Sequence, residues 1–413
     1  MRLLYVHERF GTLAGAESNA FITATALKHF GHDIGIIHGL PTGVGQSEWE
    51  ETFSNRYPLA AADPRATVQR AVREFRPDVI YVHKMADLAV IEELIDSGVP
   101  LVRMVHDHDI YCLRSYKYNY FTRKPCTRAA GLYCVIPCGA VIARNRRGGF
   151  PLKLVSYLAK KKEIRLNQKF QRMVVVSDFM RDELLKNGFD AKRIEIHAPV
   201  PRMGDPSLRS NFSERNLIVY AGQIIRGKGV DVLLRALSKI TVPFECVILG
   251  DGNHRAYCEK LSTQLGLDGR VRFCGFVVPE KVKEYYRECS AVALSSVWPE
   301  PIATVGLEVM RYGLPVVAFD VGGVNNWLID QANGFLVPWM NSTLFARALE
   351  KLLLNKELAR TMGERGRQIV NERFAFPDYI SSLDRMFAQV VEENRHPATV
   401  PSPALPLAAE PSL

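Results

Sequence analysis

Two glutamates eight positions apart are the first candidates for chemistry in this sequence of 413 residues. Glu300 and Glu308 lie in the run WPEPIATVGLE, which follows the short apolar segment 291–294. Pro301 suits the first turn of a helix, so we expect Glu300 just before that helix and Glu308 about two turns inside it. Fixed carboxylates can accept charge-assisted hydrogen bonds from sugar hydroxyls, although glutamates at this spacing are also common as solvated side chains. The free amide groups at the helix start could bind a phosphate; they belong to Ala303, Thr304 and Val305.

A glycine-rich turn at 222–229 (GQIIRGKG) is the second candidate. It follows an apolar run and precedes a helical pattern, the arrangement in which backbone amides bind phosphate. Arg226 and Lys228 add two positive charges. The spacing nearly matches a nucleotide-hydrolysing P-loop, but Gly229 stands where that motif needs a hydroxyl for Mg²⁺. We favour a phosphate site, with a P-loop and a plain strand-to-helix turn as alternatives.

A basic stretch at 139–172 holds ten Lys and Arg against one acid, Glu163, and so carries the whole net charge of +9. Its spacing of apolar residues predicts a helix with an apolar stripe; the stripe comprises Leu152, Val155, Leu158 and Ala159. Such a helix could lie on anionic lipid, and we expect residues 144–172 to make this contact. A solvated helix face is the alternative, and no nucleic-acid-binding motif supports a nucleic acid partner.

Four of the eight cysteines lie within 27 residues with the spacing C-x13-C-x7-C-x3-C. They are Cys112, Cys126, Cys134 and Cys138. Four thiolates are one ligand set for structural zinc, but no C-x2-C pair is present. A structural metal, a disulfide and reduced thiols therefore remain as alternatives.

The elements that position these residues follow from hydrophobic patterning. Short β-branched apolar runs alternate with helical patterns, which indicates buried parallel strands in βα units. Two such sets flank a proline-rich break, so we expect two doubly wound α/β domains facing a cleft that holds the ligand. The boundaries we expect are 1–200 for the first domain (with the cysteine and basic segment at 106–172), 201–216 for a linker, 217–376 for the second domain, 377–395 for a last helix and 396–413 for a disordered Pro/Ala-rich tail.

Composition narrows the class of protein. Apolar residues are 47% and charged residues 23%, which excludes a mostly disordered chain, a collagen and a coiled coil. No apolar run reaches the roughly 18–20 residues that span a bilayer, and His7, Glu8 and Arg9 interrupt the N-terminal apolar run. We therefore expect a cytoplasmic protein, with a peripheral position on the inner face of the membrane as an option.

The motifs together resemble the family-4 retaining glycosyltransferases, which have the GT-B fold. The strongest match is EPIATVGLEVMRYGLPVVAFDVGGVNNWLIDQANGFLV at 300–337, and AGQIIRGKGVD (221–231), LGDG (249–252) and VSDFMRDELLKNG (176–188) also match. AGAE at 14–17 is similar to the family's glycine loop. The resemblance covers roughly residues 1–390.

The resemblance implies roles for single residues. Glu308 would hydrogen-bond the ribose of a nucleoside-diphosphate sugar, and Glu300 would contact the hydroxyls of the donor sugar. Lys228, with Arg226, would neutralise the diphosphate leaving group, and His106 would lie near the anomeric carbon. The remaining donor-side positions are Gly15, Gly222, Ile302, Ala303, Thr304, Val305, Gly322 and Gly323.

Three positions depart from the family pattern. Gln223 stands where the family has an arginine, and we expect Arg226 to supply that charge. Ala14 replaces the first glycine of the N-terminal loop, and Ala303 replaces a glycine often found in the family.

The resulting hypothesis is a retaining, metal-independent glycosyltransferase. It would move a sugar from a nucleoside-diphosphate donor, with no further cofactor, to a glycan or lipid-linked acceptor in polysaccharide or glycolipid biosynthesis. The D-x-D at Asp107–Asp109 matches a metal motif of another glycosyltransferase fold, but the GT-B resemblance implies no catalytic metal. The alternatives are a nucleotide phosphohydrolase using 222–229 and an inactive sugar-nucleotide-binding scaffold. The residues do not specify the donor base, the sugar, the acceptor or the linkage.

Overall fold

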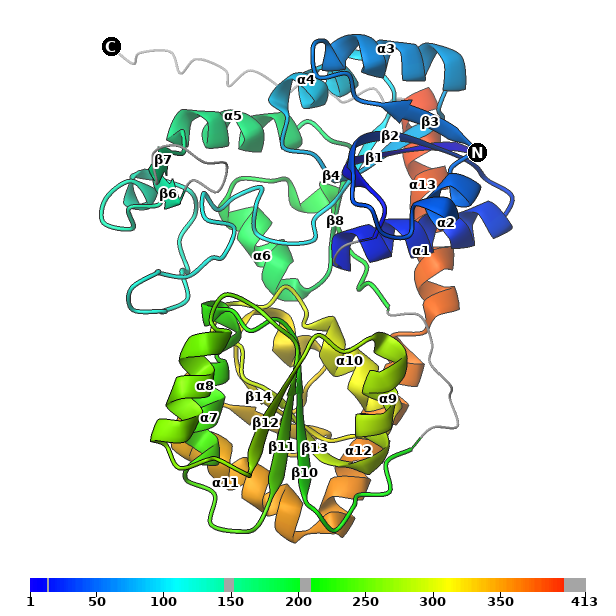
Figure 1. Cartoon of the computed structure of the whole chain (residues 1–413). Coiled ribbons are helices and arrows are strands. Elements are labelled where there is room, and N and C mark those ends of the chain that lie inside the picture. The colour runs from blue at the N-terminus through cyan, green and yellow to red at the C-terminus, as the bar shows by residue number, and fades with distance from the viewer. Residues whose placement is uncertain (13–14, 145–151, 201–208, 397–413) are drawn as a thin grey trace, which may run out of the picture.

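The computed structural model describes residues 1–12, 15–144, 152–200 and 209–396. These residues form two large parallel sheets with flanking helices, one domain above the other in Figure 1. The first sheet has the strand order β3-β2-β1-β4-β5-β8-β9, and the second has the order β12-β11-β10-β13-β14-β15. In each sheet the chain runs outward from its first strand and then returns to the other side, so the order switches between β1 and β4 and between β10 and β13. The expected pair of doubly wound domains is confirmed.

The strands are short and mostly apolar. In the first sheet they are β1 (Arg2–Phe10), β2 (Asp33–Pro41), β3 (Asn55–Pro58), β4 (Val79–Lys84), β5 (Leu101–Met104), β8 (Arg172–Val175) and β9 (Ile194–Ile196). In the second they are β10 (Leu217–Ala221), β11 (Glu245–Leu249), β12 (Val271–Gly275), β13 (Cys289–Leu294), β14 (Val316–Phe319) and β15 (Gly334–Val337). Every residue of β13 is buried, which is why these runs lack the alternation of a half-exposed strand.

Helices connect the strands and cover both sheets. Those of the first domain are α1 (Gly15–His29), α2 (Gln46–Thr52), α3 (Pro64–Phe75), α4 (Leu88–Asp96), α5 (Tyr157–Asn167) and α6 (Asp178–Lys186). Those that follow are α7 (Val230–Leu237), α8 (Arg255–Gln264), α9 (Pro279–Glu288), α10 (Thr304–Arg311), α11 (Ser342–Leu354), α12 (Lys356–Arg373) and α13 (Phe376–Arg395). Within the described ranges, the short 3₁₀ helices are η1 (Leu132–Cys134), η2 (Ala191–Arg193), η3 (Arg226–Lys228) and η4 (Gly322–Asn326).

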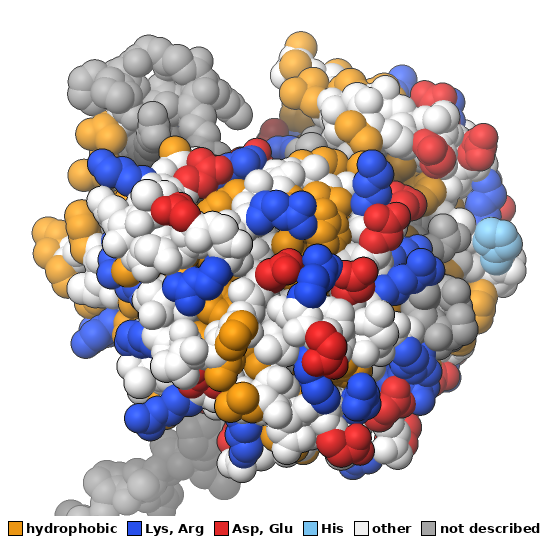
Figure 2. Space-filling model, turned by 60° about the horizontal axis from the view of Figure 1, so that its bottom comes forward, with side chains coloured by type: hydrophobic (Ala, Val, Ile, Leu, Met, Phe, Trp, Pro, Cys, Tyr) orange, Lys and Arg blue, Asp and Glu red, His pale blue; other side chains and the backbone are white. Residues whose placement is uncertain are grey.

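Charge is distributed unevenly over the surface. On the face seen in Figure 2, Lys and Arg side chains lie among Asp and Glu side chains. This mixture agrees with the sequence, in which the charges outside 139–172 sum to zero. The basic excess therefore belongs to one segment of the first domain.

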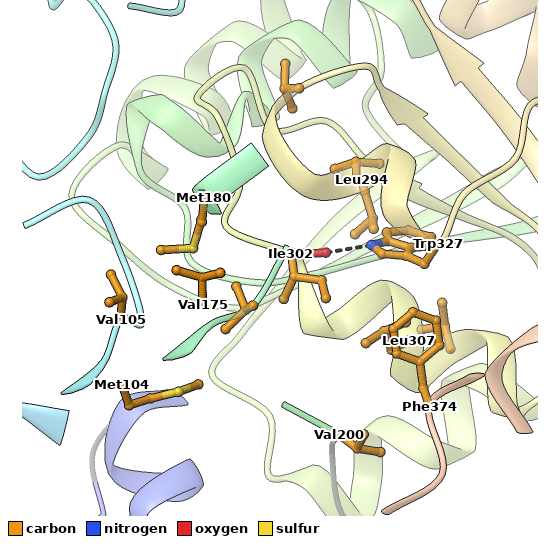
Figure 3. Packing of buried hydrophobic residues seen from close by; sticks show 14 of the residues in the cluster. Met104, Val105, Val175, Met180, Val200, Leu294, Ile302, Leu307, Trp327 and Phe374 are labelled. Atoms are coloured by element: carbon orange, nitrogen blue, oxygen red, sulfur yellow. Dashed lines mark hydrogen bonds between the residues drawn. The ribbon is translucent and has the colours of Figure 1, made fainter. Parts of the chain in front are cut away.

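Buried apolar residues of both domains belong to one hydrophobic cluster. Figure 3 shows Val175 and Met180 of the first domain beside Ile302 of the second. Trp327 is fully buried, and its indole nitrogen donates to the backbone oxygen of Ile302 over 2.5 Å. Apolar burial is the main favourable term in folding, so the loop around Ile302 is held where the domains meet.

The last helix, α13, returns to the first domain. The Tyr379 hydroxyl accepts a hydrogen bond from the Asn19 side chain at 3.1 Å, and the ring of Phe387 lies 5.0 Å from that of Tyr81. The chain thus crosses between the domains twice. The tail beyond His396 lies outside the described residues.

The prediction of a helix with an apolar stripe after Pro151 was wrong. Residues 152–154 form strand β7, and α5 begins only at Tyr157 because the Ser156 hydroxyl caps it by accepting from the Ala159 amide at 3.1 Å. Leu158 is 77% exposed, while Ile164 and Leu166 are buried. The helix therefore packs through its second half, and the leucines of the predicted stripe face outward.

The expected linker divides into two parts. Residues 201–208 lie outside the described residues. The amide of Asn211 donates to the backbone oxygen of Arg287 at 2.8 Å, so the end of this segment packs on the second domain.

Candidate active site

Glu300 lies in the loop that follows β13, beside the switch point of the second sheet. It is buried, and its Oε1 atom accepts hydrogen bonds from Lys228 Nζ at 2.7 Å, from Trp298 Nε1 at 2.7 Å and from the Ser296 hydroxyl. Burial by itself raises the pKa of Glu300, but the Lys228 charge and these three donors outweigh it and lower the pKa below its ordinary value. Glu300 is therefore a carboxylate with one oxygen engaged, and Oε2 accepts no hydrogen bond from the described residues.

Lys228 reaches Glu300 from η3, the turn after β10, on the other side of the same switch point. Its side chain is 24% exposed, and Nζ lies 5.3 Å from the centre of the Trp298 ring. Gly229 ends the turn with φ +66°, and a Cβ there would lie 2.0 Å from the Ser295 backbone oxygen. A serine or threonine cannot occupy this position without moving the chain. The turn therefore has no room for the side-chain hydroxyl that a P-loop needs at this position, which argues against the P-loop alternative.

Arg226 extends from the same turn toward the first domain. It donates to the backbone oxygens of Tyr120 and Phe121, and its guanidinium carbon lies 4.9 Å from the Tyr120 ring centre. Its charge is thus held at the interdomain boundary.

Three of the expected donor-side glycines permit close backbone packing around Glu300 and the turn. A Cβ on Gly322 would lie 2.2 Å from the Glu300 backbone oxygen, and a Cβ on Gly323 would lie 2.2 Å from that of Pro301. The Gly323 amide donates to the Glu300 backbone oxygen at 2.7 Å. Gly222, with φ +155°, packs against Gly250 of the LGDG motif, where a Cβ would lie 1.9 Å from the Gly222 oxygen.

The helix that carries Glu308 begins later than expected. Helix α10 starts at Thr304, with Ala303 in the left-handed region (φ 58°) before it, so Glu308 lies in its second turn. The prediction that Pro301 opens the helix was wrong, because hydrogen bonds to the backbone oxygens of Glu300 and Ile302 hold that stretch in a loop. Burial raises the pKa of Glu308, while Lys283 and Arg311 act to lower it. The side chain of Ile302 is buried in the interdomain cluster, and Val305 opens the helix with Thr304.

The first-domain wall of the site carries two stacked histidines at the ends of β4 and β5. His83 Nδ1 and His106 Nε2 lie 3.0 Å apart. Burial lowers the pKa of His106 to about 3, so its ring is neutral near pH 7. Lys84 Nζ contacts Asp107 at 3.0 Å and Asp109 at 3.6 Å, so a lysine already occupies the D-x-D.

Direct contacts join the two walls. His108 is fully buried, and its Nε2 donates to the Pro299 backbone oxygen at 2.8 Å while its Nδ1 accepts from the Tyr111 hydroxyl at 2.7 Å. The Ser177 hydroxyl, which caps α6, donates to the Pro301 backbone oxygen at 2.5 Å. Two first-domain side chains thus hold the residues on either side of Glu300. The order of the chain does not reveal these contacts, since their partners are more than a hundred residues apart.

The structure brings some predicted site residues together and leaves others apart. Lys228, Gly322 and Gly323 all contact Glu300 or its neighbours. Among the described residues, no hydrogen bond or ion pair joins His106, Glu308 or Gly15 to that group. Gly15 opens α1, and a Cβ on it would meet nothing within 4 Å; Ala14 lies outside the described residues.

The four clustered cysteines line one small cavity together with Tyr111 and Lys117. Burial raises the pKa of the Cys134 and Cys138 thiols. All eight cysteines are free, and the described residues contain no group of three or more His, Cys, Asp or Glu side chains placed to hold a metal ion. The structure therefore forms neither the metal site nor the disulfide that we considered.

Comparison with known proteins gives the family. The model for glycosyltransferase family 4 matches residues 13–199, and that for glycosyl transferases group 1 matches residues 208–369. The chain belongs to the family-4 glycosyltransferases. It is 29% identical to an alpha-D-kanosaminyltransferase of Streptomyces kanamyceticus over 65% of this chain and 64% of that protein. It is 30% identical to the lipopolysaccharide core biosynthesis glycosyltransferase LpsE of Rhizobium meliloti over 38% of this chain and 46% of LpsE.

A solved relative shows the same fold as this family-4 chain. The Anabaena protein HepE, crystallised with UDP and glucose, is 18% identical, with a TM-score of 0.70 over 94% of this chain and 100% of HepE. This similarity confirms the GT-B architecture. The chain spans about half to two thirds of the length of the first curated relatives it matches. No helix within the described ranges is long and apolar enough to cross a membrane.

Proposed function

We propose that this protein transfers a sugar, with retention, from a nucleoside-diphosphate sugar to a glycan or lipid-linked acceptor. The observation that carries the proposal is the ion pair between the buried Glu300 and the partly exposed Lys228 at the switch point of the second sheet. Ligands of doubly wound sheets bind at the carboxyl ends of the strands at this point. The pair there offers an anion for sugar hydroxyls and a cation for a phosphate.

The chemistry assigns each member of the pair a role. Breaking the bond between the sugar and the diphosphate leaves growing positive charge on the anomeric carbon and negative charge on the leaving oxygen. Lys228 would stabilise that oxygen without a metal ion, because a preorganised cation in a partly buried site needs little rearrangement. Glu300 would accept a hydrogen bond from a sugar hydroxyl at Oε2, while Oε1 keeps its hydrogen bonds from Trp298 and Ser296. We propose that Glu308 hydrogen-bonds the ribose of the donor. His106 and Gly15 would contact the donor sugar from the side of the first domain.

The biosynthetic setting is a further part of the proposal. LpsE is named for lipopolysaccharide core biosynthesis, and HepE was crystallised with UDP and glucose. The name of LpsE agrees with a role in polysaccharide or glycolipid assembly, and the ligands of HepE agree with a nucleotide-sugar donor. The Tyr- and Arg-rich segment 111–124 would wall the acceptor side, since the ring of Tyr116 lies 5.7 Å from that of Trp298. We propose that residues 144–172 bring the enzyme to an anionic membrane.

The first experiment measures thermal unfolding with UDP, GDP and ADP, each with Mg²⁺ and with EDTA. We expect one diphosphate to raise the Tm equally in both conditions. Lys228→Ala should weaken that binding by about tenfold or more, because it removes a charge-assisted hydrogen bond worth roughly 1.5–3 kcal/mol. Lys260→Ala, at an exposed lysine of α8 in the same domain, is the matched control and should leave binding unchanged.

Two further results would contradict the proposal. Equal binding by wild type and Lys228→Ala would remove Lys228 from the phosphate site. Binding without any turnover, tested with the matching sugar nucleotide and lipid or glycan acceptors, would favour the inactive scaffold. The anomeric configuration of the product, read by NMR, tests retention.

A further inference from the structure

A small hairpin outside both large sheets exposes one apolar face. Strands β6 (Ile142–Arg144) and β7 (Leu152–Leu154) pair antiparallel, with Ile142 opposite Leu154. Leu152 and Leu154 are two positions apart and therefore point to the same side of β7, and the residue directly opposite Leu154 points there too. The exposed fractions are 47% for Ile142, 51% for Leu152 and 85% for Leu154. Within the described residues the hairpin therefore has an apolar side that is not buried.

Exposed apolar side chains also occur in the segments that flank the hairpin in the sequence. Leu158, at the start of α5, is 77% exposed, and Leu132 and Ile136, in the turn before the hairpin, are 78% and 79% exposed. Backbone hydrogen bonds join these segments, from Ile142 to Gly139 at 3.2 Å and from Val155 to Val141 at 2.7 Å. Figure 1 shows β6 and β7 at the edge of the upper domain next to α5. We call this set the apolar patch; it comprises Leu132, Ile136, Ile142, Leu152, Leu154 and Leu158.

The charge around the apolar patch is positive. The stretch 139–172 has ten basic residues and one acid. That acid, Glu163, is buried and paired with Lys160 at 2.5 Å, so it presents no negative charge to a partner. Lys162 is paired with Glu92 of α4, whereas Lys153, between the two leucines of β7, is exposed.

Exposed apolar side chains that gather in one region mark an interaction site, and the charge around them indicates the kind of partner. An anionic bilayer takes apolar side chains into its headgroup region while its surface charge attracts Lys and Arg. A second copy of this chain would place two basic segments against each other, and like charges at an interface are costly. The patch therefore fits a lipid surface better than it fits itself.

We propose that the apolar patch docks this protein onto an anionic phospholipid bilayer, with the hairpin leucines inserted at the headgroup level. This docking rests on the proposed function, because a lipid-linked acceptor gives the enzyme its reason to bind a bilayer. The patch belongs to the segment between β5 and β8, which also contains Tyr116. The ring of Tyr116 lies 5.7 Å from that of Trp298, two residues before Glu300. A docked protein would thus hold its acceptor side near the bilayer, where a lipid-linked acceptor is found.

The test is co-sedimentation of the full chain with phosphatidylcholine vesicles, with and without phosphatidylglycerol. The variants are Leu152→Ser with Leu154→Ser and, as a matched control, Leu354→Ser, which alters a leucine of α11 that is 71% exposed. We expect wild type and the control to bind only the anionic vesicles. The double variant should bind them at least about tenfold more weakly, since two large apolar side chains no longer enter the lipid. Its circular dichroism and thermal unfolding should match wild type, because both positions are exposed.

Each other outcome would overturn the proposal. Undiminished binding by the double variant would show that the protein contacts the vesicles through other residues. Absence of vesicle binding by wild type would show that the protein does not dock on this lipid. Wild-type dimers in sedimentation velocity that the double variant abolishes would assign the patch to a second copy. Diphosphate binding is measured in parallel without vesicles. If it persists while vesicle binding is absent, membrane docking fails, including that proposed for residues 144–172, and the proposed sugar transfer stands.

Discussion

Replacing Glu300 by glutamine should cost stability in a way that depends on pH. Gln Oε1 can still accept from Trp298 and Ser296, so the change removes the charge and leaves the shape. Lys228 then loses its anionic partner at 2.7 Å. Removing one partner of a fully buried pair costs about 3–5 kcal/mol, but the Lys228 side chain is 24% exposed and regains some hydration. We therefore expect a loss of about 1–3 kcal/mol near neutral pH.

The sign of the pH dependence follows from the lowered pKa of Glu300. A carboxyl whose pKa is lower in the folded state stabilises the fold above its unfolded pKa and loses that contribution as the pH falls through its folded value. The ordinary value is 4.5. The stability difference between wild type and Glu300→Gln should therefore be constant at neutral pH and shrink as the pH falls below 4.5.

The assay is urea unfolding of both proteins at several pH values between neutral and acid. Glu357→Gln is the control, because its carboxylate, at an exposed position in α12, is 84% accessible and should give a small, constant difference. A Glu300→Gln difference that stays the same through the acid range would refute the reasoning. It would show that the carboxylate charge contributes little to the cost of the substitution.

Three other changes test how the site is held. His108→Ala should lower kcat/KM about tenfold with little loss of diphosphate affinity, because the hydrogen bond from His108 to the Pro299 oxygen positions the Glu300 loop. His108→Gln, whose amide can still donate to that oxygen, should recover most of the activity. Equal defects of the two variants in steady-state kinetics would contradict this role. Gly323→Ala should destabilise the protein by about 1–3 kcal/mol in urea unfolding, since its Cβ would lie 2.2 Å from the Pro301 oxygen, and an unchanged transition would show that the loop yields freely. Ala303→Gly should leave stability unchanged or raise it by up to about 1 kcal/mol, because glycine relieves the left-handed strain but adds unfolded-state entropy; a clear loss on thermal unfolding would count against that strain.

Much of the fold can be read from local patterns. Fully buried strands such as β13 need uninterrupted apolar residues, so their positions and the α/β class follow from the sequence. The Glu300 loop and the Lys228 turn were also identifiable, because a strand followed by glycine and charge at a helix start is a local arrangement. The start of α10 was not, since hydrogen bonds from Gly323 and Trp327, more than twenty residues away, decide that 300–302 is a loop.

The amino-acid sequence by itself determined the two α/β domains, the family and the side chains that we propose for donor binding. Only the tertiary structure decided that Lys228 and Glu300 pair and that His108 crosses to Pro299. It also decided that the leucines near Pro151 form an exposed hairpin face. Hydrophobic periodicity depends on residues within a few positions of one another, so it can be read from the sequence. Pairing between distant groups depends on how the sheets stack, and no local pattern contains that geometry.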